Sequence, residues 1–190
     1  MKRLFCAILT LALLCLTASA DTAQPGLTLT VPKETTTSAS SKTLASANTQ
    51  ALDSEEAIAN AALAADTIFD TTLTTGDVFS FNDIVGPRTE SRGYVTAENG
   101  RGVRVTGGGA AAAASAIYLA VKDLEEITVV ELSTYGSKYT GSYVESRSDA
   151  VLVDYKSGRD FRFKYTGEGT ITIDTWVEDG CVYCAIVQED

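Results

Sequence analysis

Three consecutive glycines, Gly107, Gly108 and Gly109, precede a run of alanines that we expect to form a helix from about Ala110 to Asp123. The amides of a glycine turn and of a helix N-terminus can converge on a carboxylate, a phosphate or a developing oxyanion. The first turn of this helix holds only alanines, so no reactive side chain follows the glycines. The pattern predicts either an anion-binding turn or glycines that only permit a tight turn and close packing of the helix.

Arginines flank this turn and extend the case for an anion site. A guanidinium group donates several hydrogen bonds to a carboxylate or phosphate. The candidate residues are Arg88, Arg92 and Arg104. The alternative is that these arginines pair with acidic residues of the same region, namely Glu90, Glu98 or Asp149.

The chain contains no histidine. A Ser-His-Asp triad, a Cys-His pair and every histidine-ligated metal site are therefore excluded within the chain. Two of the four cysteines fall in the first twenty residues, which leaves Cys181 and Cys184. We interpret these two as ordinary strand residues, with a disulfide or a metal site as alternatives, and we predict neither a metal ion nor another cofactor.

The N-terminus has the pattern of a secretory signal. Lys2 and Arg3 precede an apolar run from Leu4 to Leu16, and Ala18-Ser19-Ala20 follows as a small-residue cleavage site. We expect residues 1–20 to be removed, which makes the protein secreted or extracytoplasmic with no transmembrane segment after cleavage. A lipoprotein anchored through Cys15 is the weaker alternative.

The formal net charge of −10 becomes −12 when Lys2 and Arg3 are removed with the signal. An acidic protein is repelled by nucleic acid and by anionic lipid, so we exclude nucleic acid as a partner.

The remaining chain divides into a linker and one domain. Residues 21–50 are rich in Thr, Ser and Ala and predict a flexible linker, in which residues 27–31 could form an edge strand. Residues 51–190 are expected to form an α+β domain with two helices packed on a mainly antiparallel sheet.

Hydrophobic periodicity gives the first helix, from about Ser54 to Phe69, with Asp53 and Glu56 as a capping box. Residues 78–81 predict a short strand, residues 82–93 a loop, and residues 127–132 a buried strand. Four segments separated by turn residues then predict a C-terminal β-meander: residues 150–155, 161–165, 170–177 and 181–187.

The segment from Gly76 to Tyr94, "GDVFSFNDIVGPRTESRGY", resembles the VanW family of bacterial cell-envelope proteins. The resemblance continues through the three glycines to Ser115, Ile117 and Tyr118, and covers roughly residues 54–187. It implies a cysteine and a glutamine where this chain has Ala111 and Ala112, and a His-Pro-His segment near Tyr135-Gly136-Ser137. Both histidines and the cysteine are absent here.

A cysteine at a helix N-terminus beside a histidine is the arrangement that creates a nucleophile. Alanine has no atom that can attack, ligate a metal or carry a proton, so covalent catalysis at Ala111 is excluded. Ser115 and Tyr118 lie on the same side of the helix as Ala111, but no base is near them in sequence. We expect both to form hydrogen bonds within the fold or to line a ligand site.

The resemblance implies an exported cell-envelope protein. We favour a non-catalytic binding domain, a pseudoenzyme that binds peptidoglycan or a wall-associated partner. The first alternative is a wall-modifying enzyme that uses Ser115 or paired carboxylates such as Glu90, Glu98, Asp149 and Asp154. The second is a purely structural role, with the groove beside the glycines filled by Tyr94 or Tyr118.

Overall fold

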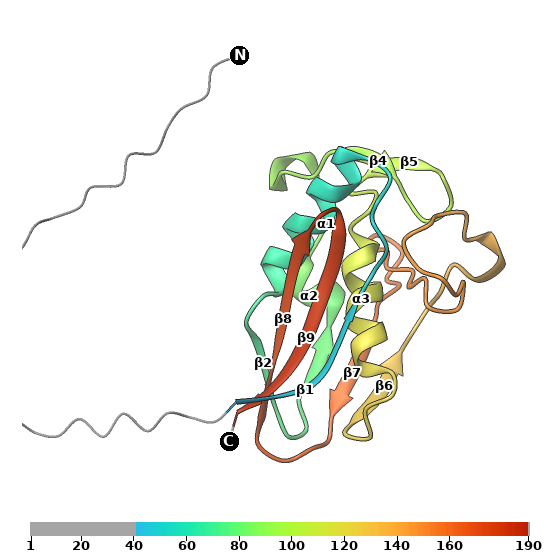
Figure 1. Cartoon of the computed structure of the whole chain (residues 1–190). Helices are drawn as coiled ribbons and strands as arrows, with labels where there is room; N and C mark the ends of the chain where they lie inside the picture. The colour runs from blue at the N-terminus through green and yellow to red at the C-terminus, as the bar shows by residue number, and fades with distance from the viewer. Residues whose placement is uncertain (1–40, 190) are drawn as a thin grey trace, which may run out of the picture. The chain divides into compact units, whose positions relative to one another are not determined.

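The computed structural model describes residues 41–189. The predicted signal peptide, the possible strand at residues 27–31 and the linker before Ser41 lie outside the described residues. Within the described part, two antiparallel sheets and two long helices confirm the predicted α+β class (Figure 1).

The larger sheet has the strand order β1-β9-β8-β2, and every neighbouring pair is antiparallel. Its strands are β1 (Ser41–Asn48), β2 (Thr71–Thr74), β8 (Thr170–Glu178) and β9 (Cys181–Glu189). Strand β1 corrects the predicted linker, because residues 41–48 pair with β9 along their length. Of its side chains, only Leu44 and Ala47 pack against the core, so backbone hydrogen bonds rather than an apolar pattern hold this strand.

The smaller sheet has the order β3-β7-β6 and consists of β3 (Val78–Ser80), β6 (Ile127–Glu131) and β7 (Arg162–Tyr165). Strand β7 therefore pairs with β3 and β6 rather than with its neighbour in the predicted meander, and residues 150–155 form only isolated bridges. Strand β6 was expected to be buried, but Val129 and Val130 are 38% and 55% exposed at the edge of this sheet.

A third sheet has only two strands, β4 (Thr96–Glu98) and β5 (Arg104–Thr106), which form a hairpin whose turn begins at Asn99. This hairpin, which we call the β4–β5 hairpin, leads directly into the three glycines.

The helices are α1 (Glu55–Ile68), α2 (Phe81–Val85) and α3 (Ala111–Val121), with short 3-10 turns at Glu90–Arg92 and Gly136–Lys138. Helix α1 is capped by Ser54, which accepts a hydrogen bond from the Ala57 amide, and not by the predicted Asp53. Helix α2 and the first 3-10 turn occupy the segment predicted as a loop.

Helix α3 lies between the two sheets, which explains its alanines. It contacts β9 and β1 of the larger sheet on one side (Figure 1). On the other side Tyr118 packs edge-on against Phe161, beside the stacked rings of Phe79 and Phe163. A helix that is apolar all round is a buried helix, and small side chains let both layers approach it closely.

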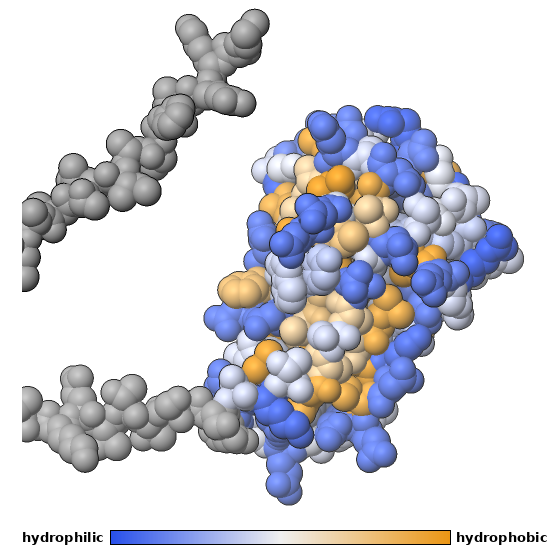
Figure 2. Space-filling view, in the orientation of Figure 1, coloured by the Kyte–Doolittle hydropathy of each residue, from blue (hydrophilic) through white to orange (hydrophobic). Residues whose placement is uncertain are grey.

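Within residues 41–189, no helix covers the outer face of the larger sheet. Trp176 stacks on Tyr183 there at 5.3 Å, and Figure 2 shows apolar residues on this face over β9 and β1. Cys184 points to the inner face, where burial raises the pKa of its thiol, and both Cys181 and Cys184 are free. No helix within residues 41–189 has the length and hydropathy needed to span a membrane.

Candidate functional site

Hydrogen bonds to the β4–β5 hairpin and to α1 hold the three glycines in place. The Gly107 amide donates to the Val95 carbonyl at 2.9 Å, and the Gly108 amide donates to the Val105 carbonyl at 3.1 Å. The buried Asn60 of α1 donates from Nδ2 to the carbonyls of Val95 and Gly108, both at 2.8 Å, and accepts from the Val95 amide through Oδ1. Asn60 thus joins the helix, the hairpin and the glycine turn.

Close packing requires glycine at all three positions. Gly107 has φ +80°, and a Cβ there would lie 2.5 Å from Arg88 Cβ. A Cβ at Gly108 would lie 2.1 Å from the Ala97 carbonyl oxygen. Gly109 has φ +92°, and its Cβ would lie 2.6 Å from the Ala57 carbonyl oxygen. Close packing alone therefore explains the glycine at position 108. Gly107 and Gly109 also border a cavity.

The start of α3 leaves donors free. Ala110 precedes the helix and has no side chain that could cap it. Among the described residues, the amides of Gly109 and Ala111 have no hydrogen-bond partner, while Gly107, Gly108 and Ala112 donate to backbone carbonyls. Two unpaired amides therefore remain at the end of the helix that carries positive partial charge.

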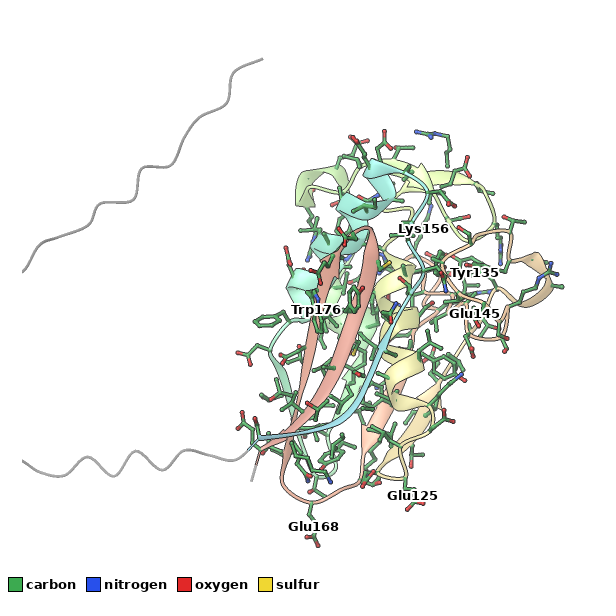
Figure 3. The ribbon with its side chains drawn as sticks, in the orientation of Figure 1. Glu125, Tyr135, Glu145, Lys156, Glu168 and Trp176 are labelled. Atoms are coloured by element: carbon green, nitrogen blue, oxygen red, sulfur yellow. The ribbon has the colours of Figure 1, made fainter. Side chains whose placement is uncertain are left out.

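A cavity of about 600 Å³ opens beside this helix start. We call it the larger cavity. Its walls come from the segment after α2, the β4–β5 hairpin, the glycine turn, Tyr135, and the segment from Leu152 to Arg159. Figure 3 shows Tyr135 and Lys156 near one another at this end of the molecule.

The larger cavity is strongly cationic although the chain is acidic. Its described lining holds the four cations Arg88, Arg101, Lys156 and Arg159 and the single acidic residue Asp154. The Asp154 carboxylate accepts from Ser157 Oγ at 2.6 Å and from the Lys156 amide at 3.1 Å. These bonds, the first above all, lower the pKa of Asp154 and hold its charge within its own turn.

None of the four cations forms an ion pair within the described part of the chain. The one ion pair there joins Lys122 and Asp149 at 3.2 Å, away from the cavity lining. Arg88 donates from Nη1 to Asn82 Oδ1 at 2.8 Å and to the Gly86 carbonyl at 3.1 Å, and burial lowers its pKa. Arg88 therefore forms no ion pair with Glu90, Glu98 or Asp149.

A second, smaller cavity of about 240 Å³ adjoins the first, and both are lined by Asn99 and Gly109. Arg104 lines this smaller cavity rather than the larger one. Its Nη2 donates to the Thr96 carbonyl at 3.2 Å.

Four predicted site residues lie outside both cavity linings: Gly108, Arg92, Ser115 and Tyr118. Arg92 is exposed and donates to the Val85 carbonyl at 2.8 Å, beside Gly86. Ser115 is fully buried and accepts from the Val151 amide at 2.9 Å, so it faces the loop after β6 instead of the cavity. Tyr118 is half-buried and packs on Phe161. Of the predicted set, the structure brings together Arg88, Gly107 and Gly109 at the larger cavity.

The carboxylates proposed for catalysis are also separated. Asp154 lines the larger cavity and Glu98 the smaller one, whereas Glu90 and Asp149 line neither. A two-carboxylate glycosidase mechanism needs both groups in one groove, and the larger cavity provides one acid in its described lining. Within residues 41–189 no group of three or more Cys, Asp or Glu side chains is placed to hold a metal ion.

Sequence reasoning missed Arg101, Lys156 and Arg159. Arg101 lies at the hairpin turn, where its guanidinium sits 5.7 Å from the centre of the Tyr135 ring. Lys156 and Arg159 flank the turn at Ser157-Gly158, which was interpreted only as a break between strands. The available signal was that each of these cations lies next to a strong turn sequence.

The fold and the site together define a class of protein: an α+β domain with a cationic cavity at the start of a buried, alanine-rich helix. The model of VanW-like proteins matches residues 56–187, and the chain belongs to the VanW family. Membership indicates a cell-envelope-associated protein. Neither the curated proteins nor the solved structures contain a match to this chain.

Two of the positions at which the resemblance implies other residues line the larger cavity. Ala111, at the expected cysteine position, and Tyr135, next to the expected histidines, both line it. Burial raises the pKa of Tyr135 even though Gly100, Arg101 and Arg88 act to lower it, so this phenol stays protonated near neutral pH. The cavity therefore has backbone and side-chain donors in its lining but no nucleophile at Ala111.

Proposed function

We propose that this protein is an exported VanW-like domain that binds an anionic component of the cell wall in the larger cavity and does not transform it. Four unpaired cations in the described lining, in a chain of net charge −10, are the observation that carries the proposal. Clustered positive charge in a concave site attracts and concentrates anions.

Carboxylates are the anions that suit this site best. The peptides of peptidoglycan carry carboxylate groups, and membership of a cell-envelope family makes peptidoglycan the most direct source. The free amides of Gly109 and Ala111 and the cations of the surrounding loops offer hydrogen bonds to such a group. Neither Tyr94 nor Tyr118 lines the cavity, which supports binding over the purely structural role.

The absence of a nucleophile at Ala111 supports binding without turnover. The buried Ser115 Oγ is engaged with the Val151 amide, so it does not replace the missing thiol. Asp154 is committed to its own turn and has a lowered pKa, which makes it a poor general acid at neutral pH.

Co-sedimentation of the chain, without residues 1–20, with purified peptidoglycan tests this function. The wild type should be retained, and retention should decrease as the salt concentration rises. The double variant Arg101→Gln/Lys156→Gln removes two exposed cavity cations and should lose most of the retention. The matched control Arg147→Gln/Lys164→Gln removes two exposed cations that line neither cavity and should behave as the wild type. Equal retention of all three proteins, or none for the wild type, would overturn the proposal.

A further inference from the structure

The smaller cavity differs from the larger one in charge. Its described lining holds two acidic residues, Asp53 and Glu98, and one cation, Arg104. Glu98 is directly opposite Arg104 in the β4–β5 hairpin, but the two do not form an ion pair. Asp53 accepts from Ser142 Oγ at 2.9 and 3.0 Å and likewise has no cationic partner among the described residues.

Tyr143 is a second feature of this cavity that points to a bound ligand. It lines the cavity and is 5% exposed. Its hydroxyl makes no hydrogen bond of good geometry within residues 41–189, although the buried Ser115 side chain lies close enough to act on its pKa. A buried hydroxyl without a partner costs free energy that a bound donor can recover. Leu52 and Ala57 add apolar surface beside it, which suits a short aliphatic chain.

The two cavities adjoin along the β4–β5 hairpin, and we call the pair the groove. Asn99 and Gly109 belong to both linings. Residues of the β4–β5 hairpin line both cavities. Arg101 and Val105 line the larger cavity, whereas Gly102 and Arg104 line the smaller one. A ligand long enough to pass Gly109 would therefore meet cations at one end and carboxylates at the other.

We propose that the ligand of this groove is a short zwitterionic peptide, with a carboxylate in the larger cavity and a free amino group in the smaller one. The charge separation between the two cavities is complementary to such a molecule, and it does not suit a neutral glycan or a polyanion. The inference rests on the proposed function and narrows it to the peptide part of peptidoglycan that carries an unlinked side-chain amine.

Calorimetric titration with three synthetic peptides tests the inference. The first is N-acetyl-L-alanyl-γ-D-glutamyl-L-lysine, in which the lysine side chain carries the one free amine. The second is its Nε-acetylated form, and the third is the first peptide with every carboxylate converted to an amide. Acetylation should weaken binding to the wild type by about fivefold, the effect of losing one partly exposed ion pair. The amidated peptide tests the larger cavity separately and should bind weakly to every variant.

The double variant Asp53→Asn/Glu98→Gln should bind the free and acetylated peptides equally. Glu90→Gln removes an exposed carboxylate that lines neither cavity, so it should retain the preference for the free amine. Equal binding of the two peptides by the wild type would overturn the inference and leave the proposed function standing. Retention on peptidoglycan with no binding of any peptide would also overturn it. Failure of both assays would remove the proposed function as well.

Discussion

Ala111 and Tyr135 line the same cavity, although one begins α3 and the other follows β6. The resemblance of the sequence to the VanW family implies a cysteine at the first position and histidines close to the second. The fold thus still brings these two positions together, while the chemistry left there is a methyl group and a protonated phenol. This geometry makes the reactivity of an introduced thiol a direct probe of the site.

Ala111→Cys should produce a thiol more reactive than an ordinary cysteine. A cysteine at the N-terminus of α3, in a cavity lined by four cations, should have a pKa below the usual value of about 8.5. The pH dependence of alkylation by iodoacetamide, followed by mass spectrometry of the folded protein, measures this pKa. The buried Cys184, whose pKa is raised by burial, is the internal control and should stay unlabelled. Labelling of position 111 only after unfolding would show that it does not face the cavity.

Ser115→Ala should reduce stability without affecting the ligand site. The change removes the acceptor of the buried Val151 amide, which should lower the free energy of unfolding by about 1–3 kcal/mol. Urea unfolding gives this value, and co-sedimentation with peptidoglycan gives the binding. A variant of unchanged stability that no longer binds would instead place Ser115 in the site.

We expect opposite effects on stability when the hydroxyl groups of Tyr139 and Tyr143 are removed. Tyr139→Phe removes the acceptor of the Val144 amide and should cost about 1–3 kcal/mol. Tyr143→Phe removes a buried hydroxyl that has no partner within the described residues, and it should be neutral or slightly stabilising. Thermal or urea unfolding at neutral pH distinguishes the two, and a large loss for Tyr143→Phe would show that its hydroxyl is bonded.

Four buried tyrosines predict that the free energy of unfolding decreases at alkaline pH. Burial raises the pKa of Tyr94, Tyr135, Tyr139 and Tyr143 in the folded protein. The unfolded chain therefore loses these protons first, at a pH of about 10, and the folded state loses stability as the pH rises further. Tyr143→Phe should make the decrease between pH 9 and 11 shallower in urea unfolding. An unchanged slope would mean that Tyr143 ionises equally in both states.

The parts of the fold that sequence reasoning predicted best have a strong local pattern. Helix α3 follows from its alanines, and the β8–β9 hairpin follows from alternation on both sides of Asp179-Gly180. Strand β1 has few apolar residues, so nothing local distinguishes it from a Ser- and Thr-rich linker. The residues 150–155 are apolar enough for a strand, but they line the core and the cavity as an irregular segment.

The sequence predicted only those site residues that belong to a distinctive local segment of the chain. Gly107, Gly109 and Arg88 were found because they belong to distinctive sequence segments. Arg101, Lys156 and Arg159 come from two other turns, and only the tertiary fold brings them to Gly109. Arg92 was included because it is near Arg88 in sequence, yet the 3-10 turn directs it to the Val85 carbonyl instead.

Amide NMR shifts give the most direct test of the central claim that an anionic wall component binds at the start of α3. The chain without residues 1–20 is titrated with soluble peptidoglycan fragments, and the 1H–15N signals of Gly109 and Ala111 are followed. Our account predicts saturable shifts of both amides, which are unpaired in the described structure, and none for Lys164, which lines neither cavity. Saturable binding that shifts other amides and leaves Gly109 and Ala111 unchanged would contradict it.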